Sequence, residues 1–109
     1  MTVKELSCTL GFSPIAMPDP DREVKGAYIG DLLSWVMGRA KSGNLWLTIM
    51  SNVNVLAVAS LADISAVVLT EGVLPESEVI DAAQEKGINL LSTSLPSYEA
   101  AKALISAGL

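Results

Sequence analysis

Apolar and polar positions alternate in blocks along the chain, and the pattern is clearest over residues 45–72. This block opens with a near-continuous apolar run, residues 45–50, and contains a second one, residues 64–69, each followed by a short polar segment. Such runs are typical of strands buried on both faces of a parallel sheet. The apolar segment between them, residues 53–62, is too long for another central strand. It therefore predicts the crossover helix of a right-handed β-α-β unit.

The crossover helix has two candidate caps and an unusual composition. Asn52 or Asn54 can cap its first turn, because a short side-chain acceptor satisfies an unpaired backbone N–H there. The helix is apolar nearly all round, so we expect both of its sides to be covered. The sheet covers one side, and a second subunit is the candidate for the other.

Local signals predict further elements before this block. Thr2 and Glu5 fit a capping box that starts a short helix, and Gly11 is a natural stop. Pro14 has no backbone N–H to donate, so residues 12–17 predict an irregular edge strand. The remaining elements expected here are a strand over 23–29 and a helix over 32–37, opened by Asp31 and weakened or ended by Gly38.

Helices and strands continue to alternate after the block. Pro75 is tolerated at a first helical position, Glu76 and Glu78 complement the helix dipole, and Gly87 ends the helix. A short strand over 88–91 and a final helix from Pro96 to about residue 106 follow. About five strands alternating with about five helices predict one α/β domain over residues 1–109. We expect a three-layer sandwich around a mostly parallel sheet.

Composition excludes several classes of protein. Half of the 109 residues are apolar and 17% are charged, which excludes intrinsic disorder and leaves some apolar surface. A net charge of -5 argues against nucleic-acid binding, which requires a basic face. No apolar run approaches the length of about 20 residues that a membrane-spanning helix needs. The N-terminal segment does not have the pattern of a secretory signal, so we expect a cytoplasmic protein.

The chain lacks the side chains that most catalytic and metal sites use. It has no histidine and one cysteine, Cys8, so it contains neither an imidazole or thiolate metal cluster nor a Ser-His-Asp or Cys-His pair. Neither phosphate-loop fingerprint, G-x-x-x-x-G-K-[ST] or G-x-G-x-x-G, is present. We therefore expect no catalytic residues, no metal and no cofactor. We interpret Cys8, in the first helix, as a small core residue.

Polar turns follow three of the predicted strands, and each precedes a helix. In open α/β sheets, ligands bind beyond the carboxyl ends of the strands, so these turns predict a rim for a sugar or phosphate oxygen. The alternative is that they are only caps and turns, which is the usual role of such residues. The candidate ligand residues are Ser51, Asn52, Thr70, Glu71, Gly72, Ser92 and Thr93, with Ser94 beside them.

Acidic and aromatic residues have ordinary structural interpretations. We interpret the acidic residues near the first turns as turn and cap residues on a solvated face, with a metal or acid/base pair as the alternative. These are Asp19, Asp21, Glu23 and Asp31. We assign the aromatic residues to the core and to a subunit interface, with Met37 and Met50 beside them. These are Tyr28, Trp35, Trp46 and Tyr98.

The pattern across the chain resembles the DRTGG domain. The similarity lies in DREVKGAYIGDLLSWVMGRAKSGNLWLTI, NVLAVASLADISAVVLTEG and PESEVIDAAQEKGINLLSTSLPSYEAAKAL, which extend from residue 21 to residue 104. This family includes stand-alone domains, modules beside CBS domains in regulated inorganic pyrophosphatases, modules in a phosphotransacetylase-type context, and relatives of the HPr kinase/phosphorylase N-terminal domain. The resemblance implies an α/β module that dimerises and acts as a regulatory or ligand-sensing part.

The two motifs that give the family its name are altered here. The family has an Asp-Arg pair after one strand, where this chain has Ser51-Asn52. The family's Thr-Gly-Gly reads Thr70-Glu71-Gly72. A carboxylate at position 71 repels a phosphate unless a cation lies between them.

The sequence therefore predicts a non-catalytic regulatory or ligand-sensing homodimer. It would bind a nucleotide or another small metabolite at the rim. The first alternative is an adaptor or structural subunit that docks on a partner enzyme without a ligand. The second is a small kinase- or transferase-related enzyme, which the chain does not favour because it lacks the groups that hold phosphates and metal in phosphoryl transfer.

Overall fold

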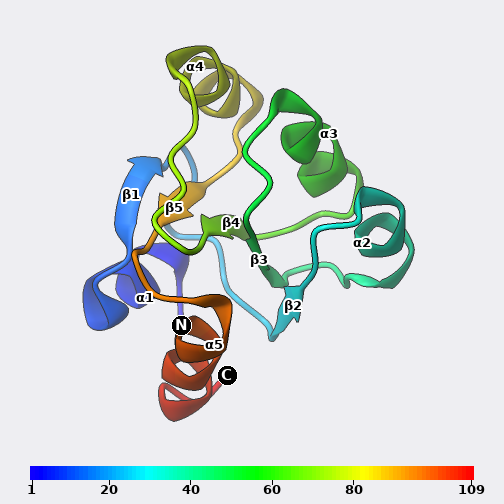
Figure 1. Ribbon diagram of the computed structural model, residues 1–109. Coiled ribbons are helices and arrows are strands. Elements are labelled where there is room, and N and C mark those ends of the chain that lie inside the picture. Colours follow the sequence, from blue (N-terminus) through cyan, green and yellow to red (C-terminus); the bar gives the residue numbers. More distant parts are fainter.

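The computed structural model describes residues 1–109 and arranges five helices around a five-stranded sheet (Figure 1). Strands and helices alternate from β2 to α5, as the sequence predicts. In chain order the elements are α1 (Val3–Leu10), β1 (Ser13–Ala16), β2 (Ala27–Ile29), α2 (Leu33–Arg39), β3 (Leu45–Thr48), α3 (Val53–Leu61), β4 (Ala66–Leu69), α4 (Ser77–Lys86), β5 (Leu90–Ser92) and α5 (Ser97–Ser106).

The sheet has the strand order β1-β5-β4-β3-β2 and is parallel except for β1, which runs antiparallel to β5. The central strands β3, β4 and β5 are buried along their whole length. Their continuous apolar runs follow from this position, because side chains on both faces pack against helices. The expected mostly parallel sheet of about five strands is confirmed.

Helices cover both faces of the sheet, so the molecule has three layers (Figure 1). One face carries α2, α3 and α4, and its core includes Trp46 and Val67. The other face carries α1 and α5, and its core includes Leu47 and Val68. These pairs are neighbours in the register of β3 and β4, where successive side chains point to opposite faces. The predicted three-layer α/β sandwich is confirmed.

Several predicted helix and strand signals act as expected. The capping box is present, since Glu5 N–H donates to Thr2 Oγ1 (3.1 Å) and Thr2 N–H donates to Glu5 Oε1 (3.2 Å). Asn52, the first of the two candidates, caps α3 by accepting from Asn54 N–H (2.9 Å). Strand β1 is an edge strand whose pairing with β5 shifts register between Pro14 and Ala16.

Strand β2 is shorter than the predicted strand over 23–29. Residues 23–25 instead bond to neighbouring segments: Val24 N–H donates to the Met1 carbonyl (3.0 Å), and Lys25 N–H donates to the Gly43 carbonyl (2.7 Å). Only residues 27–29 lie beside β3. The apolar pattern of this stretch reflects packing, because Val24 is buried under α1 although it belongs to no strand of the sheet.

The predicted starts of two helices were wrong. Asp31 does not open α2; its Oδ1 accepts from Thr48 Oγ1 (2.8 Å) and from Ile49 N–H (3.0 Å), tying the end of β2 to the end of β3. Helix α2 also continues through Gly38. Helix α4 begins at Ser77, so Pro75 precedes the helix.

The prediction that Cys8 is a small core residue was wrong. The buried stripe of α1 is Val3, Leu6 and Ser7, and Cys8 lies on the exposed side of the helix. Ser7 can be buried at little cost, because its hydroxyl donates a hydrogen bond to the Phe12 carbonyl (2.7 Å). Helical periodicity places one neighbour inside and the next outside, and the apolar character of cysteine does not override it.

The aromatic residues divide between core and surface. Trp46 is fully buried and donates its ring N–H to the Gly30 carbonyl (2.8 Å). Trp35 and Tyr98 are exposed, and Arg39 stacks over the Trp35 ring at 3.6 Å. The core assignment therefore holds for Trp46, whereas the exposed rings of Trp35 and Tyr98 lie outside the core of the single chain.

Helix α3 packs between α2 and α4 and against the sheet. These helices cover its flanks, so its apolar composition does not by itself require a second subunit. Its outward residues are mixed: Val53 and Leu61 are exposed together with Asn54 and Ser60. None of the helices has the length and hydrophobicity needed to cross a bilayer.

Candidate functional site

The predicted rim lies where β3, β4 and β5 end side by side. Two of its three turns are bonded together through their backbones. Glu71 N–H donates to the Leu95 carbonyl (2.9 Å), and Gly72 N–H donates to the Thr93 carbonyl (3.0 Å). The turns after β4 and β5 therefore form one rigid unit, and these N–H groups are not free to hold an anion.

The rim residues that face inward support the structure. Thr70 is fully buried, and its hydroxyl is 2.7 Å from that of Ser97, the first residue of α5. Ser92 is buried at the end of β5. The Thr93 hydroxyl accepts from Leu95 N–H (3.2 Å) and shapes the turn. These side chains hold the start of α5 against the sheet.

Glu71 has a backbone conformation that is rare for its residue type. Its φ is 61°, Gly72 follows with φ 74°, and Val73 N–H donates to the Thr70 carbonyl (3.1 Å). This is the pattern of a type I′ turn, which favours Asn or Gly at both central positions. The left-handed region costs a residue with a Cβ about 1–2 kcal/mol. Its side chain is exposed, so the turn presents a carboxylate to solvent.

The third predicted turn borders an open cavity of about 340 Å³. Ser51 and Asn52 line one side, and the cavity lies at the N-terminal end of α3. Sequence analysis missed its other wall, which is formed by the connection from β4 to α4 and by the start of α4. Leu74 was the available signal, because a large apolar side chain that is 70% exposed within a loop needs a partner or a ligand. The lining residues are Ser51, Asn52, Val53, Leu74, Glu76, Glu78 and Val79.

The electrostatics of the cavity select against bare phosphate. Glu76 and Glu78 line it, Glu71 is exposed in the connection that leads to them, and no lining residue is a cation. The N-terminal end of α3 offers weak positive potential on the opposite wall. The cavity therefore suits a ligand that donates hydrogen bonds to carboxylates, through hydroxyl or amine groups, and that has an apolar part to cover Leu74.

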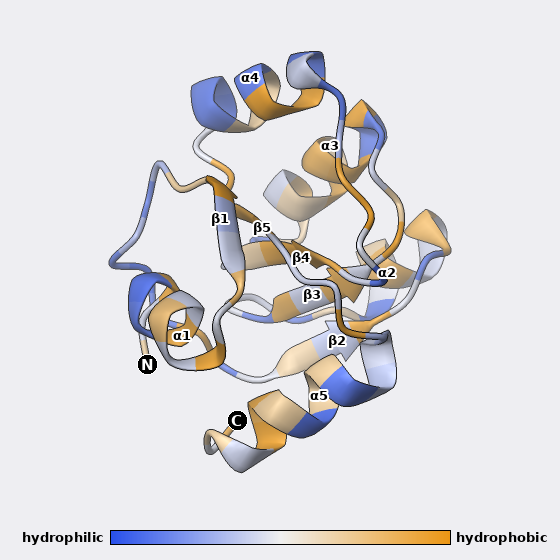
Figure 2. Cartoon of the chain, turned by 60° about the vertical axis from the view of Figure 1, so that its left-hand side comes forward, coloured by the Kyte–Doolittle hydropathy of each residue, from blue (hydrophilic) through white to orange (hydrophobic).

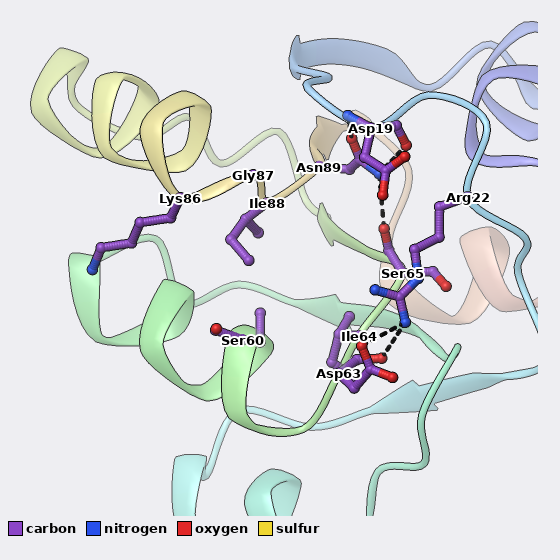
Figure 3. A pocket seen from close by; sticks show the side chains of 11 residues that line it. Asp19, Arg22, Ser60, Asp63, Ile64, Ser65, Lys86, Gly87, Ile88 and Asn89 are labelled. Carbon is purple, nitrogen blue, oxygen red and sulfur yellow. Dashed lines mark hydrogen bonds and ion pairs between the residues drawn. The ribbon is translucent and has the colours of Figure 1, made fainter.

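A smaller polar cavity of about 160 Å³ lies at the opposite end of the strands, between the α3–β4 and α4–β5 turns (Figure 3). Its buried polar groups are fully occupied. The Asn89 side chain accepts from Asp19 N–H (3.0 Å) and donates to the Asp19 and Ser65 carbonyls (2.7 and 3.0 Å). The Ser65 hydroxyl donates to the Glu23 carbonyl (2.5 Å). These contacts fasten the 19–23 segment to the sheet.

Arg22 and Asp63 form an ion pair at the mouth of this cavity (2.8 Å), while Lys86 extends away from them (Figure 3). Arg22 also donates to the Asp63 carbonyl (2.9 Å), and Ser42 donates its hydroxyl to the other carboxylate oxygen. The Ser42 hydrogen bond, followed by the Arg22 interactions, holds the pKa of Asp63 below its usual value. The residues around this cavity therefore have a structural role, because their contacts join three segments of the chain.

No three histidine, cysteine or carboxylate side chains lie close enough together to hold a metal ion. The acidic residues Asp19, Asp31 and Glu23 have separate structural partners: the Asn89 amide for the Asp19 backbone, the end of β3 for Asp31, and the N-terminal ammonium for Glu23. They do not form one site.

Taken together, the fold defines a small three-layer α/β module whose open cavity lies at the carboxyl ends of parallel strands. A model of the DRTGG domain family matches residues 21–107, and the chain belongs to this family. The predicted resemblance is thus confirmed over most of the chain.

A solved structure shares the fold. It is the CBS and DRTGG domains of the regulatory region of Clostridium perfringens pyrophosphatase, complexed with its activator diadenosine tetraphosphate. The TM-score is 0.76 at 15% sequence identity, over 95% of this chain. This chain spans 46% of that one, so it corresponds to about half of the regulatory region. No curated protein matches the sequence.

Proposed function

We propose that residues 1–109 act as a single non-catalytic, ligand-sensing regulatory module that forms a homodimer. Its ligand is a nucleoside, a nucleotide or a similar hydroxyl- and amine-bearing metabolite, bound in the cavity between Ser51-Asn52 and the 74–79 segment. The observation that carries the proposal is this open cavity of about 340 Å³ at the carboxyl ends of the strands. Membership of a family found in a regulatory region supports it.

The lining residues suggest how such a ligand is held. Ribose or amine groups would donate to Glu76 and Glu78, and the Ser51 hydroxyl would bond a neighbouring oxygen. A base or another flat apolar group would cover Leu74. Phosphates would point to solvent or carry a divalent cation, because the carboxylates repel them.

A thermal-shift screen tests the ligand. The pure protein is heated with adenosine, AMP, ATP and diadenosine tetraphosphate, each with and without Mg²⁺. A ligand at about one hundred times its dissociation constant stabilises the native state by about 2.7 kcal/mol, which raises the melting temperature by several degrees. A response to none of these compounds would overturn the nucleotide proposal and favour the adaptor that docks on a partner enzyme.

Variants separate the rim cavity from the other surfaces. We expect Ser51→Ala and Glu78→Gln to reduce the ligand-induced shift, because each removes a group that faces the cavity. Ser60→Ala is the matched control, since it is the same substitution at an exposed serine that lies at the far end of α3, beside the smaller cavity. Thr70→Val is unsuitable, because Thr70 is buried and bonds Ser97. A shift lost in Ser60→Ala alone would place the ligand elsewhere.

A further inference from the structure

The sheet is open at β2. The Gly26 carbonyl accepts from Leu45 N–H in β3 (3.0 Å), and Gly30 N–H donates to the Leu47 carbonyl in β3 (3.2 Å). Alternate residues of a parallel strand face the neighbouring strand, so Tyr28 faces β3 as well. The N–H and C=O groups of Ala27 and Ile29 therefore point away from the sheet, and both residues are exposed. This edge can accept another strand.

An apolar groove of about 240 Å³ lies beside the open edge, between β2 and α5, which are neighbours in Figure 2. All of its lining residues are hydrophobic: Ala27, Ile29, Leu47, Ala101, Leu104, Ile105 and Leu109. A second groove of about 220 Å³ shares two of these residues and extends over α5 to Tyr98. Ile29, Ile105 and Tyr98 are 51%, 70% and 78% exposed. Free backbone groups and apolar side chains thus lie on one continuous surface, which we call the β2–α5 surface.

We infer that the occupant of the β2–α5 surface is a second copy of this chain, whose β2 pairs antiparallel with the first about a two-fold axis at Tyr28. This inference deepens the homodimer of the proposed function and rests on it. With that axis, Ala27 of one copy lies opposite Ile29 of the other. These two residues carry the outward N–H and C=O groups, so they form the hydrogen-bonded pairs of an antiparallel ladder.

The residues around β2 fit this register. Gly26 falls opposite Gly30 at a non-hydrogen-bonded position, where the Cα atoms of the two strands approach to about 4.5 Å. Lys25 falls opposite Asp31, which pairs opposite charges at both ends of the contact. Each copy has a net charge of -5, yet no aspartate or glutamate lines either groove, and Lys102 has the one charged side chain among the lining residues. Two copies can therefore meet at these grooves without bringing acidic side chains together.

Sedimentation equilibrium tests the surface with lysine substitutions. Ile29→Lys and Ile105→Lys place charges on the β2–α5 surface. Leu61→Lys is the matched control, because Leu61 is 74% exposed, close to the 70% of Ile105, but lies on α3. We expect the first two variants to raise the dimer dissociation constant at least about tenfold, equal to about 1.4 kcal/mol, and the control to leave it unchanged. Thermal melts verify that each variant remains folded.

The outcomes separate this inference from the proposed function. A wild-type chain that is monomeric at about 100 μM would overturn both the homodimer and this surface. A dimer disrupted by Leu61→Lys but not by Ile29→Lys or Ile105→Lys would overturn this surface and place the interface on α3. The nucleotide-induced thermal shift tests the rim cavity independently of both results.

A cysteine cross-link tests the register directly. Residues at a non-hydrogen-bonded antiparallel position have Cα atoms about 4.5 Å apart, within the range of a disulfide. Tyr28→Cys, in a Cys8→Ser background that removes the exposed native thiol, should form a covalent dimer under mild oxidation. Ile29→Cys in the same background should not, because each new thiol faces Ala27. Equal cross-linking of both variants, or cross-linking of Ile29→Cys alone, would overturn the register.

Discussion

Two residues occupy left-handed backbone conformations that glycine usually adopts, and they differ in whether their side chains have partners. Asp63 (φ 57°) follows α3, and its carboxylate joins Arg22 and Ser42. Glu71 (φ 61°) has no bonded side-chain partner in the structure and lies near the rim cavity. Backbone hydrogen bonds hold this conformation, from Glu71 N–H to the Leu95 carbonyl and across the turn from Val73 N–H to the Thr70 carbonyl, but the carboxylate takes no part in them. The presence of glutamate at a strained position is therefore a candidate for a functional role.

Replacement of Glu71 measures that cost. We expect Glu71→Gly to stabilise the protein by about 0.5–1 kcal/mol, since relief of the left-handed strain exceeds the added flexibility of the unfolded chain. Glu71→Ala removes the same carboxylate but keeps the strain, so its free energy of unfolding should stay close to that of the wild type. Urea denaturation measures both. An equal gain in Glu71→Ala would show that charge, and not backbone strain, sets the cost.

Asp63 predicts a dependence of stability on pH. Its pKa is lowered in the folded state, so the unfolded state binds a proton more readily as pH falls. The contribution of the Asp63 carboxylate to the stability of the folded state is fully present above the unfolded pKa, about 3.9, and is lost as pH falls below that value. In urea titrations, the stability difference between wild type and Asp63→Asn should be larger at pH 7 than below about pH 4. Asn tolerates the left-handed backbone, so a difference independent of pH would contradict the role of the carboxylate.

At the level of elements, short capping signals determine where some helices begin. The Thr2–Glu5 capping box starts α1, which then covers one face of the sheet through Val3 and Leu6. Helix α2, in contrast, has no side-chain cap, and the connection at Asp31 positions its start by tying β2 to β3. Local capping and long-range ties are thus two separate ways in which this chain places its helices.

Loss of the capping box should weaken α1. We expect Thr2→Ala to lower the free energy of unfolding by about 1 kcal/mol, because it leaves the Glu5 N–H without its acceptor. Thr9→Ala is the matched control, since Thr9 is an exposed threonine in the same helix and has no capping role. Chemical denaturation of both variants gives the comparison. Equal losses would indicate that threonine content, and not the cap, stabilises the helix.

At the scale of the whole molecule, the sequence predicts the layers better than the contacts between distant segments. The buried runs at 45–50 and 64–69 and the crossover between them fix a parallel sheet, because such runs must be covered on both faces. The tie from Asp31 to Thr48 and the pairing of residues 23–24 with the N-terminus depend on which segments meet. No local sequence pattern predicts which of these distant segments contact one another.

The candidate site shows the same division. The sequence predicts that strand ends share an edge, and the structure places the three turns there. It cannot predict that Ser97 bonds Thr70 from 27 positions away, which removes one hydroxyl from the open rim. It also assigns Glu76 and Glu78 to a helix dipole, although they line the cavity, because the path of the 71–76 connection depends on tertiary packing.

The two edges of the sheet differ in a way that limits growth. Pro14 lies in the outer strand β1, and a shift of register interrupts that strand's pairing with β5. Proline and irregular pairing both discourage a further strand from adding to an edge. Association through β2 about a two-fold axis would bury the receptive edge of each copy and leave only the two protected ones outside. The assembly would then be closed at two copies, so a protein with an open sheet edge and apolar surface would still avoid forming fibres.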